Sequence, residues 1–181
     1  MTPRTEMIPA WDGPSLVPRE KLDVHRRGLR HPAISVFVMA GDAVLLQQRA
    51  AGKYHTPLLW TNTCCTHPHW GETAADCARR RLWQEMGIEG LVLRPAAVIE
   101  YRADVGAGLT EHEVVDLFLA EADRSLVLNP DPAEVQDVAW MNVGELVRDV
   151  KDRPARYTPW LRIYLAEHGQ AIFEAPSLSA R

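Results

Sequence analysis

The chain has 181 residues, of which 46% are apolar and 24% are charged, and its formal net charge is −4. This length suits one domain with a substantial core and is short for two. The negative charge argues against non-specific binding of nucleic acid, which depends on surplus positive charge, although a local basic pocket can still hold an anion. We therefore expect one globular domain over residues 1–181 with no nucleic-acid partner.

The three cysteines point to a reducing compartment. Cys64 and Cys65 are adjacent and Cys77 is the third, so the chain offers a poor disulfide framework. The N-terminus lacks the apolar run of a signal peptide, and the longest apolar stretch, near Ile34–Ala40, is far too short to span a membrane. We expect a cytoplasmic protein, monomeric and without a membrane partner.

The first half of the chain is predicted to contain a hairpin and a helix. Residues 1–18 are rich in proline and polar groups and should wrap the surface. Ala33–Ala40 is typical of a strand, a Gly-Asp turn follows, and Ala43–Arg49 should return as its hairpin partner. Leu59–Cys65 is expected to be extended.

A helix is predicted to begin after Thr73, whose hydroxyl can cap it, with Asp76 three residues on as a capping-box variant. It should run to about Glu85 and end at Gly87, because glycine readily takes the left-handed conformation that ends helices.

The second half is predicted to add strands and helices. The strands are expected over 91–103, 111–120 and 138–141, and the helices over 143–151 and from Thr158-Pro159 to Gly169, with 176–181 as a frayed tail. Strands mixed with helices and hairpins indicate an α/β or α+β fold, built as an α/β/α sandwich with a mixed sheet.

Two histidines near the N-terminus, His25 and His31, are the first candidates for a metal site. One helix would separate them by about 240° of rotation, so they could converge only if a loop carries them. Taken alone, such a pair is more typical of an exposed surface.

Residues 60–68 (WTNTCCTHP) bring a thiol near an imidazole. In an extended strand, Cys65 and His67 point to one face and Cys64 points to the other. The pair could be a nucleophile, a metal site or part of the core, because a free cysteine is often a small buried hydrophobic residue.

Glu111 and Glu113 share one face of a predicted strand that continues with apolar residues. Two carboxylates so close together repel each other unless they face solvent or hold a cation between them. Because the strand is otherwise apolar, a metal or catalytic role is favoured over a solvated face.

The helix that ends at Gly87 partly matches the Nudix box, G-x5-E-x7-R-E-U-x-E-E-x-G-U, in which U is a bulky apolar residue. The residues that fit are Glu72, Arg80, Leu82, Glu85, Gly87 and Ile88, and those that depart are Thr66, Arg81 and Gln84. Arg81 and Gln84 stand where the box has glutamates, so carboxylates that hold metal ions in a Nudix hydrolase are missing.

Together, these segments resemble the type I isopentenyl-diphosphate isomerases, a family with the Nudix fold, from about Lys21 to about His168. The segments that occur in the family's order and spacing are TNTCCTHP, RRRLWQEMG, EYRADV, TEHEV and TPWL. The resemblance implies an enzyme of isoprenoid precursor synthesis that interconverts isopentenyl and dimethylallyl diphosphate by a redox-neutral proton shift.

The resemblance also implies roles for individual residues. The implied ligands of a Mn²⁺, Zn²⁺ or Mg²⁺ ion are His25, His31, His67, Glu111 and Glu113. Glu85 would hold Mg²⁺ against the diphosphate, and the implied diphosphate contacts are Lys21, Arg49, Lys53 and Arg81. The implied catalytic residues are Cys65, Glu113, Tyr101 and Trp160.

The implied chemistry suits these residue types. An alkene is a weak base, so its protonation needs a positioned acid and a stabilised tertiary carbocation. Cys65 and Glu113 would be acid and base on opposite faces of the allylic unit, with Tyr101 hydrogen-bonded to the carboxylate. The face of Trp160 would stabilise the cation, and exclusion of water would prevent its capture as an alcohol.

The chain departs from the family pattern in two places. The family has one more residue between the N-terminal histidines, and Cys64 offers a second thiol beside Cys65, although strand alternation favours Cys65. Two other classes of function compete with the isomerase. A Nudix pyrophosphohydrolase would need the missing box carboxylates, and a non-catalytic metal-binding or interaction module would not explain the cysteine, glutamate and tryptophan beside the ligands.

Overall fold

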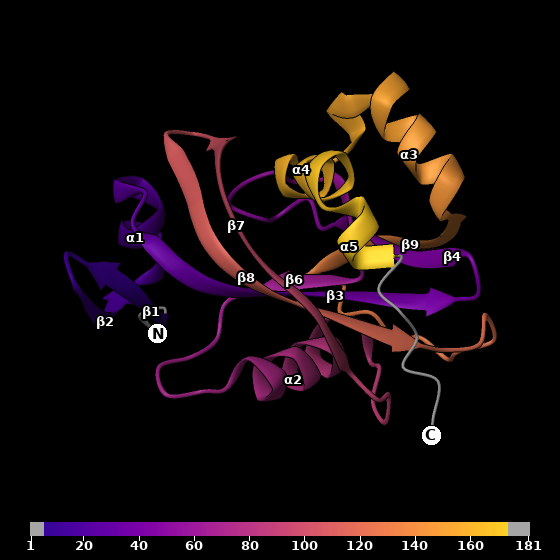
Figure 1. Cartoon of the computed structure of the whole chain (residues 1–181), viewed down its shortest axis with the longest axis horizontal. Coiled ribbons are helices and arrows are strands. Elements are labelled where there is room, and N and C mark those ends of the chain that lie inside the picture. Colours follow the sequence, from indigo (N-terminus) through magenta and orange to yellow (C-terminus); the bar gives the residue numbers. More distant parts are fainter. Residues whose placement is uncertain (1–5, 174–181) are drawn as a thin grey trace.

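The chain folds into an α/β/α sandwich with a mixed sheet between its helices (Figure 1). The computed structural model describes residues 6–173. The strands are β1 (Met7–Asp12), β2 (Ser15–Glu20), β3 (Arg30–Ala40), β4 (Ala43–Arg49), β5 (Trp60–Thr61), β6 (Cys64–Thr66), β7 (Arg94–Gly106), β8 (Leu109–Glu121) and β9 (Val135–Asn142). The helices are α1 (Lys21–Arg27), α2 (Ala74–Met86), α3 (Val143–Asp152), α4 (Pro159–Glu167) and α5 (Gly169–Phe173), with a 3-10 turn at Pro154–Arg156.

The main sheet is mixed because β3 and β8 run parallel, whereas the other paired strands are antiparallel. β3 pairs with β4 near its C-terminal end and with β6 in its middle, and β4 also pairs with β5 and β9. The predicted sandwich with a mixed sheet is thereby confirmed. Within residues 6–173, no helix is both long and apolar enough to cross a lipid bilayer.

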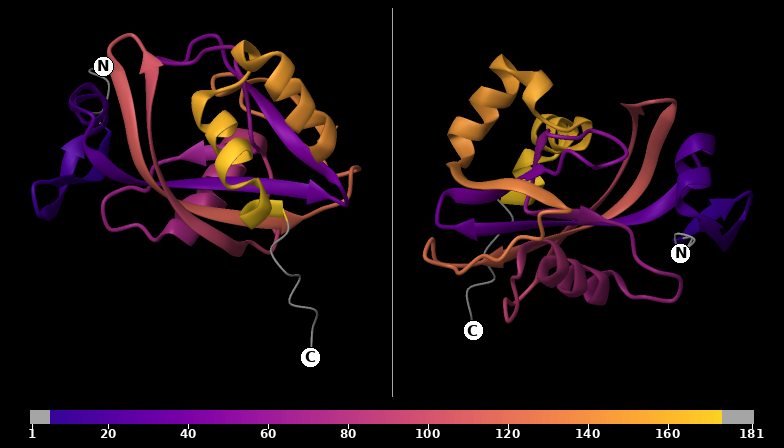
Figure 2. Two further views of the ribbon diagram at one scale, coloured as in Figure 1. Left: turned by 45° about the horizontal axis from the view of Figure 1, so that its top comes forward. Right: turned by 180° about the vertical axis from the view of Figure 1, so that it is seen from behind.

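Two hydrophobic cores fill the two faces of the sheet. Ile34, Val36 and Val38 of β3 pack with α2 in one core, whereas Phe37 and Met39 pack with α3, α4 and α5 in the other. This division follows from the two-residue period of a strand. The two views of Figure 2 show α2 on one side of the sheet and the three C-terminal helices on the other.

The predicted elements of the central region form, with shifted ends. The β3–β4 hairpin, β7, β8, β9 and α3 all lie where they were expected. Gly169 differs from expectation, because it begins α5 and does not close the last helix. α4 ends at Glu167, and His168 follows it as the cap, with its N–H donating to the Tyr164 carbonyl. The tail predicted over 176–181 lies outside the described residues.

The N-terminal segment contains elements that the sequence analysis did not predict. Residues 7–20 form the β1–β2 hairpin, in which Ile8 is fully buried, and α1 follows it directly. Gly28 ends α1 in the left-handed region with φ of 60°, and its N–H donates to carbonyls of the last turn. His25 therefore lies on a helix and His31 on a strand, with a tight turn between them.

α2 begins and ends as predicted. Thr73 Oγ1 accepts the N–H of Asp76 at 3.2 Å. Gly87 follows the helix with φ of 67°, and its N–H reaches back to carbonyls of the last turn. A Cβ atom added at Gly87 would lie 2.7 Å from the Cβ of Asn129, so this glycine also permits a close approach of the loop before β9.

Replacing Gly87 by alanine should destabilise the protein more than replacing Gly41. Both glycines have positive φ, but an added Cβ at Gly41 meets no atom within 4 Å. The left-handed conformation costs alanine about 1 kcal/mol, and overpacking against Asn129 should add about 1–3 kcal/mol at Gly87. Urea-unfolding curves of Gly87→Ala and Gly41→Ala measure the difference; equal losses would show that the loop at Asn129 yields without cost.

Candidate active site

Strand register assembles the candidate site on the sheet face that packs against α4. His31 on β3 pairs with Glu113 on β8, and Glu113 pairs with Tyr101 on β7. The three side chains thus form one row across three strands. Four residues further along β3, on the same face, Ser35 pairs with Cys65 on β6. The sheet therefore carries a polar row beside a thiol.

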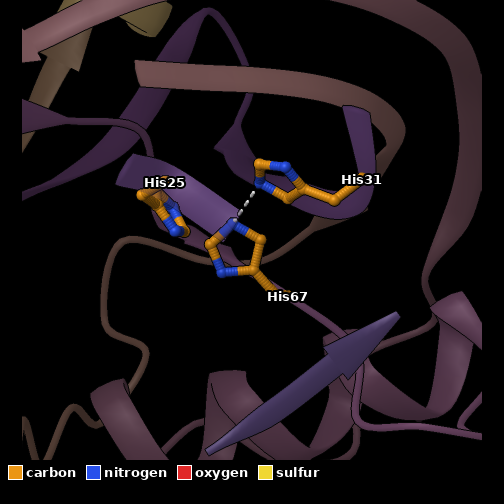
Figure 3. Close-up of side chains that lie close together, drawn as sticks. All are labelled: His25, His31 and His67. Atoms are coloured by element: carbon orange, nitrogen blue, oxygen red, sulfur yellow. Dashed lines mark hydrogen bonds between the residues drawn. The ribbon is translucent and has the colours of Figure 1, made fainter. Parts of the chain in front are cut away.

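Three imidazoles meet at the buried centre of the site (Figure 3). His25, His31 and His67 each offer a ring nitrogen, and these nitrogens lie within 4.8 Å of one another. Nδ1 of His25 lies 2.6 Å from the Lys21 carbonyl, and Nδ1 of His31 lies 2.7 Å from the Leu29 carbonyl. Because a carbonyl only accepts, Nδ1 carries the hydrogen in both rings, and each Nε2 presents a lone pair.

Nitrogen lone pairs that point into a buried space need a hydrogen-bond donor or a cation to replace the water that burial removes. His67 Nε2 lies 3.1 Å from His31 Nε2 and 2.9 Å from Glu113 Oε1. Within residues 6–173, the buried side-chain polar atoms without a hydrogen-bond partner are His25 Nε2 and His67 Nδ1. Clustered imidazole nitrogens beside a carboxylate, two of them without a hydrogen-bond partner, suit a divalent metal ion. The residues present therefore fit the predicted metal site.

Burial favours the neutral imidazole at His25 and at His67. Loss of hydration lowers the pKa of His25 to about 4 and holds the pKa of His67 well below its usual range. Neutral imidazole is the form that binds metal ions.

Two buried carboxyl groups, Glu111 and Glu113, share one phenol. The Tyr101 hydroxyl lies 2.7 Å from Oε2 of each. Burial, followed by the charge of Glu113, raises the pKa of Glu111. Burial alone would also raise the pKa of Glu113, but the imidazoles of His31 and His67, whose Nε2 atoms lie 3.6 Å and 2.9 Å from Oε1, hold that pKa well below its usual range. The pKa values of these two neighbouring carboxyls are thus shifted in opposite directions.

Cys65 presents its thiol beside these groups. Its Sγ lies 2.9 Å from the Ser35 hydroxyl and 4.0 Å from the Tyr164 hydroxyl. Burial, followed by the charge of Glu113, raises the pKa of the thiol, so the sulfur stays protonated at neutral pH. Cys64 is fully buried in the core under α2. Strand alternation therefore places Cys65, and not Cys64, at the site.

A cleft opens over this cluster, and cations surround it. Its lining combines Cys65, His67, Glu111 and Glu113 with the cations Lys21, Arg49, Lys53 and Arg81 and the indole of Trp160. Tyr101, His25 and His31 do not line the cleft and lie behind these residues. Negative charge in the buried carboxyls thus meets positive charge at the rim, as an anionic substrate requires.

Trp160 forms an apolar wall of the cleft. It is 1% exposed, and its Nε1 donates to the Thr61 hydroxyl at 2.7 Å, which fixes the plane of the indole. The guanidinium of Arg49 lies 5.2 Å from the ring centroid. Arg49 also donates to the carbonyls of His55 and Thr56, both at 3.2 Å, so its own position is fixed by the loop.

Glu85 lies beneath the cleft on α2 and does not line it. Its carboxylate accepts from Arg81 Nε at 3.0 Å and from the Gln47 amide at 2.9 Å. A second carboxylate, Glu134, lies 3.3 Å from Arg81 and also contacts the ammonium of Lys53. An anion that binds at Lys53 and Arg81 must therefore compete with Glu134.

The sequence analysis missed several residues of this site. They are Ser35, His55, Glu134 and Tyr164. Ser35 and Tyr164 stand in ordinary apolar strand and helix patterns, and Glu134 is one acidic residue in a loop. His55 is the residue that a signal could have found, because a histidine in a loop next to a cationic segment is a candidate ligand.

Cys65 should react slowly with iodoacetamide at pH 8, because a raised pKa leaves little thiolate and the thiolate is the nucleophile. Its rate should rise only as the pH passes well above the ordinary thiol value of 9.0. Cys64 and Cys77 are fully buried and serve as internal controls that stay unlabelled in the folded protein. Peptide mass spectrometry after timed labelling measures each site, and rapid labelling of Cys65 at pH 7 would contradict the assignment.

Comparisons with known proteins agree with this architecture. Residues 29–161 match the NUDIX domain family. The chain is 67% identical over 169 residues to a Cereibacter sphaeroides protein named isopentenyl-diphosphate Delta-isomerase. The matched region covers 93% of this chain and 96% of that protein. The chain is 59% identical to a protein of the same name from Roseobacter denitrificans, again over 93% of this chain and 96% of the other.

Solved structures share the fold at low sequence identity. The Deinococcus radiodurans protein DR0079 superposes with a TM-score of 0.70 and 13% identity, over 87% of this chain and 95% of that one. The E. coli dihydroneopterin triphosphate pyrophosphohydrolase gives a TM-score of 0.56 and 20% identity, over 79% and 92%. Such identities show the fold alone. The family match and the high identity to the curated relatives show more: this chain belongs to the Nudix superfamily and, within it, to the isopentenyl-diphosphate Delta-isomerases.

Proposed function

We propose that this isomerase interconverts isopentenyl diphosphate and dimethylallyl diphosphate by protonating one end of an allylic unit and deprotonating the other. The composition of the cleft carries the proposal: a thiol, a carboxylate, an indole face and four cations line the same space. These are the parts that the proton shift requires, namely an acid, a base, a partner for the carbocation and an anchor for the diphosphate. The identity to the curated isomerases supports the same reaction.

Cys65 and Glu113 are proposed as the acid and base. Their environments shift their pKa values in opposite directions, raised for the Cys65 thiol and lowered for the Glu113 carboxyl. Such a pair holds one proton to give and one site to receive another. One group protonates the terminal carbon of the alkene while the other removes a proton from the allylic carbon, and the roles exchange when the reaction reverses. Tyr101 orients the Glu113 carboxylate through its hydroxyl.

Trp160 is proposed to stabilise the tertiary carbocation between the two proton transfers. Its indole is buried in the cleft wall and fixed by Thr61. An aromatic face contributes about 2 kcal/mol to a desolvated cation. The ring already has the Arg49 guanidinium beside it, so this wall accommodates positive charge. A closed, water-poor cleft would also keep the cation from being captured as an alcohol.

The diphosphate is proposed to bind at the cationic rim, on Lys21, Arg49, Lys53 and Arg81. Arg81 stands where a Nudix hydrolase would place a metal-binding glutamate, and Gln84 replaces another. A box helix with these changes offers fewer ligands for the ions that activate water. The isomerase is therefore favoured over a pyrophosphohydrolase on the same fold.

The metal centre is proposed to use His25, His31, His67, Glu111 and Glu113, with Mn²⁺, Zn²⁺ or Mg²⁺ as the ion. When bound, the ion supplies positive charge that stabilises the ionised carboxylates next to the substrate. Glu85 is proposed to hold Mg²⁺ with the diphosphate. The backbone carbonyls that accept from Nδ1 of His25 and of His31 fix the orientation of both rings.

The setting of the protein completes the proposal. We propose one domain over residues 1–181 that acts as a monomer in the cytoplasm. The free thiols of Cys64, Cys65 and Cys77 suit a reducing compartment.

Purified, metal-loaded protein should convert isopentenyl diphosphate to dimethylallyl diphosphate in D₂O, with deuterium incorporated and no phosphate released. Proton NMR follows the isomer, and a phosphate assay follows hydrolysis. Released phosphate without the isomer would favour the pyrophosphohydrolase. Folded protein with metal bound that yields neither product would favour a non-catalytic module.

Cys65→Ala and Glu113→Gln should each lower kcat by about 10²–10⁴, the usual worth of a positioned acid or base. Cys64→Ala is the matched control, because this neighbouring thiol lies in the opposite core. Its kcat should stay close to that of the wild type. Either site variant with most of its activity retained would overturn the acid–base assignment.

Trp160→Phe should retain far more activity than Trp160→Leu. Both replacements are smaller than tryptophan, but phenylalanine keeps an aromatic face for the carbocation. The cation–π contribution of about 2 kcal/mol predicts a difference of about 30-fold in kcat. Steady-state kinetics with matched thermal-unfolding curves measure this, and equal kcat values would remove the cation–π argument.

His67→Ala should bind a divalent metal far more weakly than the wild type, because it removes a nitrogen from the centre of the cluster. Titration of metal-free protein with Co²⁺ against a chelator measures the affinity. His69→Ala is the control, since this exposed histidine lies two residues away from His67. Equal affinities of His67→Ala and the wild type would contradict the proposed ligand set.

A further inference from the structure

His55 lies beside the metal cluster but outside the ligand set proposed above. Its Nε2 is 3.4 Å from Oε1 of Glu111. Ring nitrogens of His25 and His55 and a carboxylate oxygen of Glu111 lie within 4.8 Å of one another. The imidazole is only 6% exposed. His55 is therefore a buried histidine directed at a candidate metal-binding carboxylate. Neither the Nudix box nor strand alternation predicts it at this site.

Its neighbours hold the ring in one orientation. The ring lies stacked on His25, with centroids 5.9 Å apart, and its edge meets Trp160 and Tyr54 at 5.9 Å and 4.4 Å. Arg49 fixes the backbone below, because it donates to the carbonyl of His55 at 3.2 Å. The imidazole is therefore a rigid part of the cleft wall, placed between the metal cluster and the indole.

Hydrogen-bond partners define what this imidazole does. Nδ1 lies 3.0 Å from the Thr56 hydroxyl, which can donate to it, and Nε2 then carries the ring hydrogen toward Glu111. The other oxygen of Glu111, Oε2, lies 2.7 Å from the Tyr101 hydroxyl. His55 and Tyr101 therefore lie against different oxygens of one carboxylate, at 3.4 Å from Oε1 and 2.7 Å from Oε2.

We propose that His55 is a positioning residue of the metal centre, which orients Glu111 through the contact of its Nε2–H with Oε1 and thereby raises metal affinity. The inference rests on the proposed metal centre and adds a residue to it. His55 groups with His25 and Glu111, whereas His31 and His67 group with His25 alone. Its Nε2 lies against Glu111, so its effect on the ion is assigned to that carboxylate. Partners that orient a ligand typically change metal affinity by about 10–100-fold.

The test measures Co²⁺ affinity of the full chain in its metal-free form by competition with a chelator. His55→Ala should bind Co²⁺ about 10–100-fold more weakly than the wild type. His55→Gln should recover most of the affinity, because its amide N–H can still reach the carboxylate. His69→Ala, an exposed histidine, should match the wild type. If His55→Ala does not fold, His55→Leu, which fills the space without an N–H, takes its place.

Two results would overturn the inference. The first is wild-type affinity in His55→Ala or His55→Leu. The second is a His55→Gln variant as weak as His55→Ala, which is the behaviour of a direct ligand or of lost packing. His67→Ala, titrated alongside, separates this failure from failure of the metal centre. If His67→Ala also binds Co²⁺ as tightly as the wild type, the proposed metal centre is contradicted. If only His67→Ala loses affinity, the proposed ligand set is supported and His55 does not contribute to it.

Discussion

The parallel pairing of β3 with β8 is the constraint on which the rest of the site depends. Its register sets His31 opposite Glu113, and the antiparallel pairing of β7 then sets Tyr101 beside the same carboxylate. A slip of one residue would turn His31 toward the core under α2 and expose a different set of side chains to the cleft. The apolar residues that follow on β3 prevent such a slip, since Ile34 and Phe37 must each remain in its own core. Hydrophobic packing at one end of the sheet thus positions polar chemistry at the other.

That arrangement concentrates polar groups where water cannot reach them, and their mutual contacts must compensate for lost hydration. The protein groups alone do this incompletely. His67 pairs with Glu113, and Tyr101 joins Glu113 to Glu111, yet the Nε2 of His25 has no partner. An ion at the centre would satisfy the imidazole lone pairs and the carboxylates together. The unpartnered nitrogens and the paired carboxyls are therefore the features of this cluster that fit a cation.

Sequence predicted the local parts of this structure and missed the distant ones. The ends of α2 follow from the side chain of Thr73 and the backbone freedom of Gly87, and both act within one helical turn. Strand alternation likewise placed Cys65 on one face with His67. The β1–β2 hairpin was missed because Pro9 and Pro18 argue against strands, although they oppose each other in a two-stranded ribbon that is all edge. His55 and Glu134 reach the cleft only through loops, so no periodicity marks them. The convergence of His25 with His31 was likewise implied by family resemblance alone, since it depends on the helix and turn at Gly28.

The electrostatics of α2 differ from those of a Nudix box helix that holds metal ions on its glutamates. Arg81 projects toward the cleft from the position of a box glutamate, and Glu85 and Glu134 balance its charge from below. Those carboxylates keep a desolvated guanidinium ionised and fixed, because burial would otherwise favour its neutral form. The helix thereby presents positive charge to the cleft where a hydrolase would present metal ligands. A fold does not determine chemistry, and here a guanidinium that lines the cleft replaces a carboxylate that would hold the ions that activate water.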